Sequence, residues 1–227
     1  MIRTPQQDAR HLAYTVLLRV ADGAYSDLAL DSELRRCTLD QRDRRFVTEL
    51  VYGVLRLRGR IDFALSCFCN QPLPRLQTEA RWLLRIGAYQ LLEMDRVPSH
   101  AAVDATVELA RKLGQAGLTG ILNGVLRALD RGRDDIPWPQ PQQIRPYLER
   151  VCSLPTWLAK EVMRQLPNEQ ARALGEALAQ PPRQSVRINT LKTDRDSFLE
   201  RLEAAGHEAS PCTFAPEGVV LERRGEQ

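Results

Sequence analysis

The sequence predicts a mainly α-helical protein: a seven-helix bundle, then a short helical segment, then a small, incomplete α/β module. Apolar residues recur at three- and four-residue steps through residues 8–131, with only short breaks between the periodic stretches. Beyond residue 181 the pattern changes to the alternation that is typical of a strand. The chain has 227 residues, which exceeds the usual domain of about 100–150 residues, so more than one unit is expected.

Capping residues and helix breakers delimit the seven predicted helices. The first is expected over residues 8–20, and Ser26 or Asp27 is placed to cap the second. Asp40 is placed to cap the third, which runs towards residue 57. A fourth and a fifth helix are expected around residues 61–68 and 76–92. Pro98 ends that pattern, Ser99 is placed to cap the sixth helix, and the seventh follows Gly117.

The second part of the chain begins with prolines at every other position of residues 137–141, which predicts a stiff linker. Helices are expected over residues 154–166 and from Asn168 to residue 179. Val186 and Ile188 then alternate with polar residues as in a half-buried strand, followed by a helix near Phe198 and an extended stretch at 218–222. The expected boundaries are 1–134, 135–180 and 181–227.

Composition favours a soluble globular chain with a sizeable core, because 43% of the residues are hydrophobic and 27% are charged. No apolar run approaches the length of about 20 residues that spans a bilayer. Residues 1–10 are polar where a signal peptide carries an apolar block, so a cytoplasmic location is expected.

Neither a metal site nor a catalytic residue is predicted. The five cysteines are odd in number and irregularly spaced, which argues against a disulfide framework and a zinc site and favours buried free thiols. The three histidines lie far apart in the sequence, and none adjoins a nucleophile motif.

Arginine clusters are the candidate binding residues. The formal net charge is only +3, but the excess lies in the first 135 residues, and arginine, which forks onto phosphates, greatly outnumbers lysine. Taken singly, each arginine also fits a solvated or ion-paired surface residue, and Asp40, Asp43 and Glu49 are close enough to neutralise part of the cluster. The candidates for RNA phosphates are Arg3, Arg10, Arg42, Arg44, Arg45, Arg56, Arg58 and Arg60.

Other polar residues sit beside core positions and suggest internal roles instead. Arg81, Arg85, Arg111 and Arg127 are expected to hold carboxylates or helix ends, and Asn123 is expected to bond to neighbouring backbone.

Three segments carry a family resemblance: DRRFVTELVYGVLR at 43–56, RWLLRIGAYQLLEMDRVPSHAAVDATVELAR at 81–111, and GILNGVLRALDR at 120–131. In this order they resemble the NusB-type domain that opens the RsmB (Sun/Fmu) family, bacterial methyltransferases that make 5-methylcytosine in small-subunit ribosomal RNA. The segment PPRQSVRINTLK resembles the start of that family's ferredoxin- or RRM-like module before the catalytic domain.

The resemblance implies an RNA-binding bundle that recognises small-subunit ribosomal RNA for a methyltransferase domain lying outside this chain. S-adenosylmethionine is the family's cofactor, but these residues contain no strand followed by a glycine-rich turn, so no cofactor site is expected here. Pro211 and Cys212 resemble part of a family motif and are assigned no catalytic role. One alternative is a stand-alone NusB-like antitermination factor acting through a protein partner, and another is a helical adaptor without RNA affinity.

Overall fold

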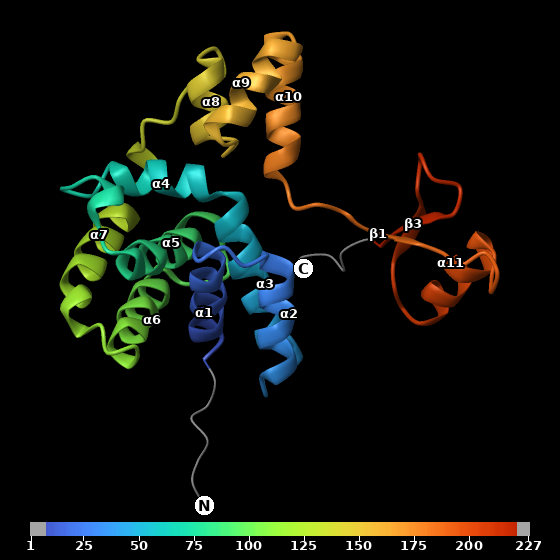
Figure 1. Ribbon diagram of the computed structural model, residues 1–227, viewed down its shortest axis with the longest axis horizontal. Helices are drawn as coiled ribbons and strands as arrows, with labels where there is room; N and C mark the ends of the chain where they lie inside the picture. The colour runs from blue at the N-terminus through green and yellow to red at the C-terminus, as the bar shows by residue number, and fades with distance from the viewer. Residues whose placement is uncertain (1–7, 222–227) are drawn as a thin grey trace, which may run out of the picture. The chain divides into compact units, whose positions relative to one another are not determined.

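The computed structural model describes residues 8–221, which belong to two compact units that divide between residues 179 and 180 (Figure 1). The first unit is helical, and its α-helices are α1 (Ala9–Ala21), α2 (Ser26–Arg36), α3 (Gln41–Arg56), α4 (Arg58–Ser66), α5 (Thr78–Glu93), α6 (Ser99–Lys112), α7 (Thr119–Gly132), α8 (Ile144–Arg150), α9 (Thr156–Gln165) and α10 (Asn168–Ala179). The second unit contains β1 (Gln184–Arg187), α11 (Arg195–Ala204), β2 (Ala209–Pro211) and β3 (Gly218–Leu221). Within residues 8–221, no helix is long and apolar enough to cross a membrane.

Aspartate side chains start two helices of the bundle. The Asp8 carboxylate accepts from the backbone N–H of Arg10 at 2.9 Å and caps α1. The Asp40 carboxylate accepts from the N–H of Asp43 at 2.8 Å and caps α3, as the sequence predicts. Each bond satisfies a backbone donor that the first helical turn leaves without an intrahelical acceptor.

Two predicted serine and aspartate caps are wrong. The residues before α2 and α6 are Tyr25 and Pro98, both with non-helical backbone, and neither makes a side-chain cap. Ser26, Asp27 and Ser99 therefore lie inside the first turn, where their side chains no longer point back at the free N–H groups.

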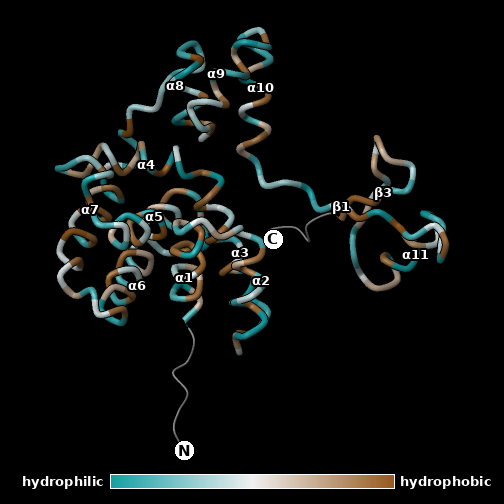
Figure 2. Tube along the Cα trace, viewed as in Figure 1, coloured by the Kyte–Doolittle hydropathy of each residue, from teal (hydrophilic) through white to brown (hydrophobic). Residues whose placement is uncertain are grey.

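Helix α5 is the centre of the bundle and packs against α1, α3, α4, α6 and α7. Ten of its 16 residues are buried, all between Ala80 and Leu91. Hydrophobic and hydrophilic residues are interspersed along the helices of the bundle, as their colours show (Figure 2). The predicted seven-helix bundle is confirmed. Its largest fully buried side chains are Tyr89, Leu17, Leu50, Ile61, Leu65, Leu83, Leu84, Ile86, Leu109, Leu122, Leu126 and Leu129.

Helices α8, α9 and α10 enclose a second, smaller core, built from Leu148, Cys152, Leu154, Ala159, Val162 and Ala171. The sequence predicts α9 and α10 but not α8. This helix has only seven residues and includes Pro146 in its first turn, where a missing N–H costs nothing. A helix this short carries too little apolar periodicity to stand out beside the prolines of the linker.

The proline-rich linker packs onto α4 through an aromatic pair. The rings of Phe63 and Trp138 are 5.5 Å apart. The guanidinium of Arg60 lies 4.7 Å from the Trp138 ring centroid, and that of Arg150 lies 5.0 Å from the Phe63 centroid. These contacts attach residues 136–150 to the bundle, and residues up to 179 belong to the same compact unit.

The second unit is a three-stranded antiparallel sheet in the order β1–β3–β2. Val219 of β3 lies opposite Val186 of β1 and Pro211 of β2, and it is fully buried. Because β1 and β2 are both antiparallel to β3, they run parallel to each other and are connected by α11, as in a split βαβ unit.

The prediction of a half-buried first strand is wrong. All four residues of β1 are exposed, whereas Ile188, one residue beyond the strand, is buried. The reason is that α11 packs mainly against β2 and β3, so β1 lies at the edge of the covered face.

The cysteines differ from the predicted set of buried thiols. Cys152 is buried, Cys67 is exposed, and Cys37, Cys69 and Cys212 are half-buried, all as free thiols. Only the cysteine on the small second core has the predicted environment.

Candidate RNA-binding surface

A depression of about 700 Å³ lies along α6, with further walls from the starts of α1 and α3 and from the segment between α5 and α6. It contains four cationic and two acidic side chains: Arg10, Arg42, Arg96, Lys112, Asp8 and Asp43. Cations therefore outnumber carboxylates, and the depression suits an anionic ligand such as an RNA phosphate.

Arg10 is held in a fixed position inside this depression. Its Nε donates to Oε1 of Gln90 at 2.8 Å, and its guanidinium lies 4.9 Å from the ring centroid of Phe46. Gln90 is itself buried and donates to the carbonyl of Ile86 at 2.9 Å. Burial lowers the pKa of Arg10, although the nearby carboxylates oppose the shift. An arginine starts from so high a pKa that it stays charged at neutral pH.

The exposed face of α3 forms a strip that continues from the depression. Arg42, Arg45, Glu49, Tyr52 and Arg56 follow at steps of three and four residues, which places them on one side of the helix. Arg42 and Arg45 are exposed to solvent, as the sequence predicts for the polar side of this helix. We call these five residues the α3 strip.

Arg56 is the last residue of the α3 strip, and its side chain is only 16% exposed. Its Nη2 is 4.0 Å from Oε1 of Glu49, and its buried Nε has no hydrogen-bond partner within residues 8–221. Glu49 also accepts a short hydrogen bond from the hydroxyl of Tyr89. The carboxylate of Glu49 is thus committed to two internal partners rather than to Arg42 and Arg45.

Two candidate arginines hold the fold together. Nη1 of Arg44 donates to the carbonyl of Leu34 at 2.6 Å, at the last turn of α2. Nε of Arg60 donates to Oε1 of Glu93 at 2.7 Å, and its guanidinium covers the Trp138 ring. Both side chains are half-buried between helices, which matches the alternative of a paired residue better than that of a free phosphate-binding group.

The other candidates differ in position. Arg58 is exposed at the first residue of α4, just beyond the α3 strip. Arg3 lies outside the described residues. The sequence prediction omits Arg96, in the middle of the α5–α6 connection, and Lys112, the last residue of α6. Their separation in the sequence hid them, because only the fold brings them beside Arg10.

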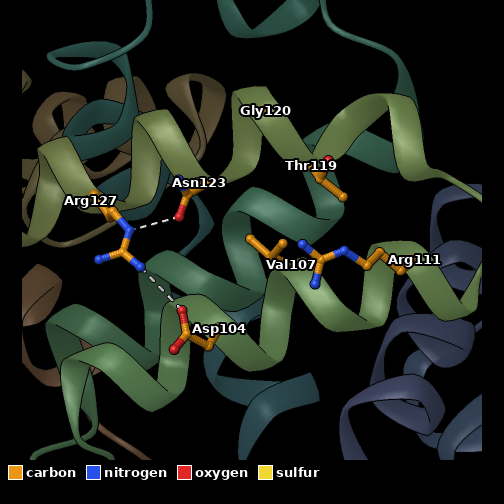
Figure 3. A pocket seen from close by; sticks show the side chains of 7 residues that line it. All are labelled: Asp104, Val107, Arg111, Thr119, Gly120, Asn123 and Arg127. Atoms are coloured by element: carbon orange, nitrogen blue, oxygen red, sulfur yellow. Dashed lines mark hydrogen bonds and ion pairs between the residues drawn. The ribbon is translucent and has the colours of Figure 1, made fainter.

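A second polar pocket, of about 370 Å³, lies between α6 and α7 (Figure 3). Nε of Arg127 donates to Oδ1 of Asn123 at 2.7 Å, and Nη2 lies 3.3 Å from Asp104. Arg111 pairs with Glu108 at 3.1 Å. This pocket holds only two cations and one carboxylate, Asp104, and both of its arginines have side-chain partners. The depression holds four cations, and although Arg10 binds Gln90 and Lys112 pairs with Asp8 at 3.5 Å, it remains the more cationic of the two.

The expectation that Asn123 bonds to neighbouring backbone is wrong. Asn123 is exposed and accepts from a side chain, not from nearby backbone, because it lies on the outer face of α7 one turn before Arg127. The expectation for Arg85 is confirmed: its Nε and Nη2 donate to the two carboxylate oxygens of Asp62 at 2.7 and 2.8 Å.

Two segments of the chain match models of known protein families. Residues 7–131 match the model of the NusB family, more than half of the chain. The chain belongs to the NusB family. Residues 154–226 match a second model, the ferredoxin-like domain of RsmF/B-like methyltransferases. The two matches cover the seven-helix bundle and the region from α9 through the small sheet.

Curated relatives share both regions with this NusB-family chain. It is 32% identical over 216 residues to the probable ribosomal RNA small subunit methyltransferase B of Bacillus subtilis, covering 93% of this chain and 47% of the relative. The protein of the same name in Synechocystis sp. is 31% identical over 214 residues, with 94% and 48% covered. The chain thus spans about half the length of the curated relatives it matches.

Solved structures share the fold. PH0851 aligns with a TM-score of 0.66 at 16% identity, over 99% of this chain and 50% of that one. A crystal structure of the antitermination factors NusB and NusE in complex with dsRNA aligns with a TM-score of 0.51 at 22% identity, covering 58% of this chain and 99% of that one.

Proposed function

We propose that this chain binds small-subunit ribosomal RNA and serves as the recognition part of a cytosine-5 ribosomal RNA methyltransferase. The observation that carries the proposal is the continuous cationic surface formed by the depression and the exposed arginines of the α3 strip, on a NusB-family bundle. Phosphates of a folded RNA present regularly spaced negative charge, and guanidinium groups bind them through paired N–H donors.

The match to the ferredoxin-like domain favours this proposal over a free-standing antitermination factor. That domain model covers residues 154–226 and is described for RsmF/B-like methyltransferases, and the curated relatives named above are ribosomal RNA methyltransferases. The solved NusB–NusE complex aligns with 58% of this chain, whereas the curated relatives align with 93% and 94% of it.

Methyl transfer from S-adenosylmethionine belongs to this proposal as the activity of the whole protein. We assign to this chain the binding and orientation of the RNA. The described part of the second unit supports this division, since its sheet is small and antiparallel, whereas dinucleotide-type cofactor sites lie at the carboxyl ends of parallel strands.

Binding of deproteinised small-subunit ribosomal RNA, measured by filter binding from low to moderate salt, tests the proposal. Affinity should fall steeply as salt rises, because each neutralised phosphate releases a condensed counterion. The variant Arg42→Ala, Arg45→Ala, Arg58→Ala should bind more weakly and with a flatter salt dependence. Arg44 and Arg60 are left intact because they have structural partners.

The matched control is Arg131→Ala, Arg164→Ala, Arg172→Ala, which removes the same charge from exposed positions on α7, α9 and α10. It should retain most of the affinity and most of the salt slope. Equal losses in the two triple variants would mean that net charge alone attracts the RNA, and the proposed surface would be wrong.

A further inference from the structure

The α3 strip contains an exposed aromatic residue, Tyr52, that is not part of the buried core. Tyr52 is 38% exposed, and the first turn of α2 adds Tyr25 at 77% and Leu28 at 65%. Large apolar side chains with this much exposure on neighbouring elements mark a contact surface more often than isolated ones do.

Helix packing brings these residues together. Arg44, near the start of α3, donates to the carbonyl of Leu34 near the end of α2, so the two helices form an antiparallel hairpin. The start of α2 therefore lies beside the later turns of α3. Burial raises the pKa of Tyr52, and the carboxylate of Asp27 in the first turn of α2 contributes to the shift, which places this turn near the phenol.

Cations precede the aromatic group along the same helix face. At 1.5 Å per residue, Arg45 lies roughly 10 Å and Arg42 roughly 15 Å along the axis from Tyr52. Arg42 also lines the basic depression, so cationic groups lead from the depression along the first half of the α3 strip. Glu49 lies between Arg45 and Tyr52, and its carboxylate is bound by Tyr89 and Arg56.

We propose that Tyr52, assisted by Tyr25, stacks on an unpaired base of the RNA strand whose phosphates lie on Arg42 and Arg45. This inference rests on the proposed RNA-binding function and specifies the kind of RNA that the surface selects. Bases inside a duplex are already stacked on their neighbours, whereas a loop or bulge presents a free face to an aromatic ring. The flanking cations favour RNA over an apolar protein partner.

A carboxylate beside Tyr52 opposes RNA at the stacking position. The carboxylate of Asp27 lies near Tyr52 and repels a phosphate that follows the stacked base, whereas Glu49 is held by Tyr89 and Arg56. The variant Asp27→Asn should therefore tighten binding severalfold, since the amide keeps a similar shape and removes the charge.

The decisive experiment compares two RNA probes: a hairpin with an unpaired loop that carries 2-aminopurine, and a fully paired duplex of the same length. Tyr52→Leu should weaken hairpin binding roughly 5- to 150-fold, since stacking of one base on an aromatic ring is worth about 1–3 kcal/mol. Duplex binding and the salt slope should stay unchanged, and quenching of 2-aminopurine fluorescence should be lost. Tyr52→Phe keeps the ring and should retain hairpin binding.

The exposed Trp157 of α9 provides the matched control, because Trp157→Leu removes a ring that is 70% exposed and outside the strip. It should leave hairpin binding unchanged. If the wild-type chain binds neither RNA in a salt-dependent way, the proposed function fails and this inference fails with it. If the wild type binds RNA and Tyr52→Leu binds the hairpin equally well, or loses hairpin and duplex binding alike, only the stacking inference is overturned.

Discussion

The backbone N–H of Gly59 donates to Oγ of Ser153 across 2.7 Å, although the two residues are 94 positions apart in the sequence. Gly59 lies in the first turn of α4, where N–H groups lack intrahelical acceptors, so Ser153 acts as a cap supplied from another part of the chain. Ser153 itself adopts a left-handed backbone with φ of 64°. This contact connects the seven-helix bundle to the segment that follows α8.

Substitutions at Ser153 should separate the hydrogen bond from the backbone strain. Ser153→Ala loses the bond and keeps a side chain in the left-handed region, which should cost about 1–2 kcal/mol of unfolding free energy. Ser153→Gly loses the same bond but removes the steric penalty, so it should be the more stable of the two by about 1 kcal/mol. Urea denaturation measures both. Equal midpoints would show that the left-handed backbone carries no cost here.

Gly59 should resist replacement, because a Cβ atom there would lie 2.7 Å from the backbone carbonyl oxygen of Glu149. Gly59→Ala is expected to destabilise the protein by roughly 1–3 kcal/mol. Gly124 is the control, since it lies within α7 and a Cβ there would meet nothing within 4 Å. Gly124→Ala should stabilise by about 0.5–1 kcal/mol. A tolerated Gly59→Ala would mean that α4 and α8 separate easily.

The bundle was predictable because helical periodicity is a local property. Each of the seven helices carries its own apolar stripe, and Asp40 caps α3 through a neighbour three residues away. The placement of Ser26 and Ser99 failed by one residue, because the non-helical residue that precedes each helix is Tyr25 or Pro98. Cap position depends on where the chain turns into the helix, and composition alone does not fix it.

The candidate surface was predictable only in part. Arg42 and Arg45 could be found because their cluster and its helical side are visible in the sequence. Arg44 has the same composition around it and yet turns to a carbonyl of α2, which depends on the angle at which two helices pack. The residues that complete the depression, Arg96 and Lys112, are brought in by tertiary structure.

The bidentate pair between Arg85 and Asp62 should contribute more than an exposed pair. The Arg85 side chain is 11% exposed and its guanidinium lies 4.5 Å from the Trp82 ring centroid. Asp62→Asn should destabilise by roughly 1–3 kcal/mol, because it leaves a half-buried guanidinium without its counter-charge.

The control for this pair is Glu161→Gln, which breaks the exposed ion pair with Arg164 on α9. Exposed pairs of this kind contribute about 0–1 kcal/mol, so the change in thermal midpoint should be small. Similar losses in Asp62→Asn and Glu161→Gln would contradict the importance of burial at Asp62.

The candidate arginines should divide into structural and surface groups by their effect on folding. Arg60→Ala removes the bond to Glu93 and the stack on Trp138, and should lower the unfolding free energy by roughly 1–3 kcal/mol. Arg58→Ala, two residues earlier and exposed, should change it by less than about 0.5 kcal/mol. Chemical denaturation of the two variants checks this. A destabilised Arg58→Ala would require that its effect on RNA binding be reassigned to misfolding.

Cys152 should make the protein lose stability in alkali. It is buried in the small core of α8, α9 and α10, and burial raises its pKa to about 11 from an ordinary value of 9.0, assisted by the carboxylate of Glu176 and opposed by Arg60. The folded state therefore holds the thiol proton more tightly than the unfolded chain does. The resulting stabilisation is complete below pH 9 and is lost as the pH rises from 9 towards 11.

Denaturation midpoints measured across this range should fall faster for the wild type than for Cys152→Ala. The variant should be less stable at pH 9 because of the cavity that it creates, but it lacks the titrating thiol. Parallel curves would show that the thiol ionises equally well in the folded protein.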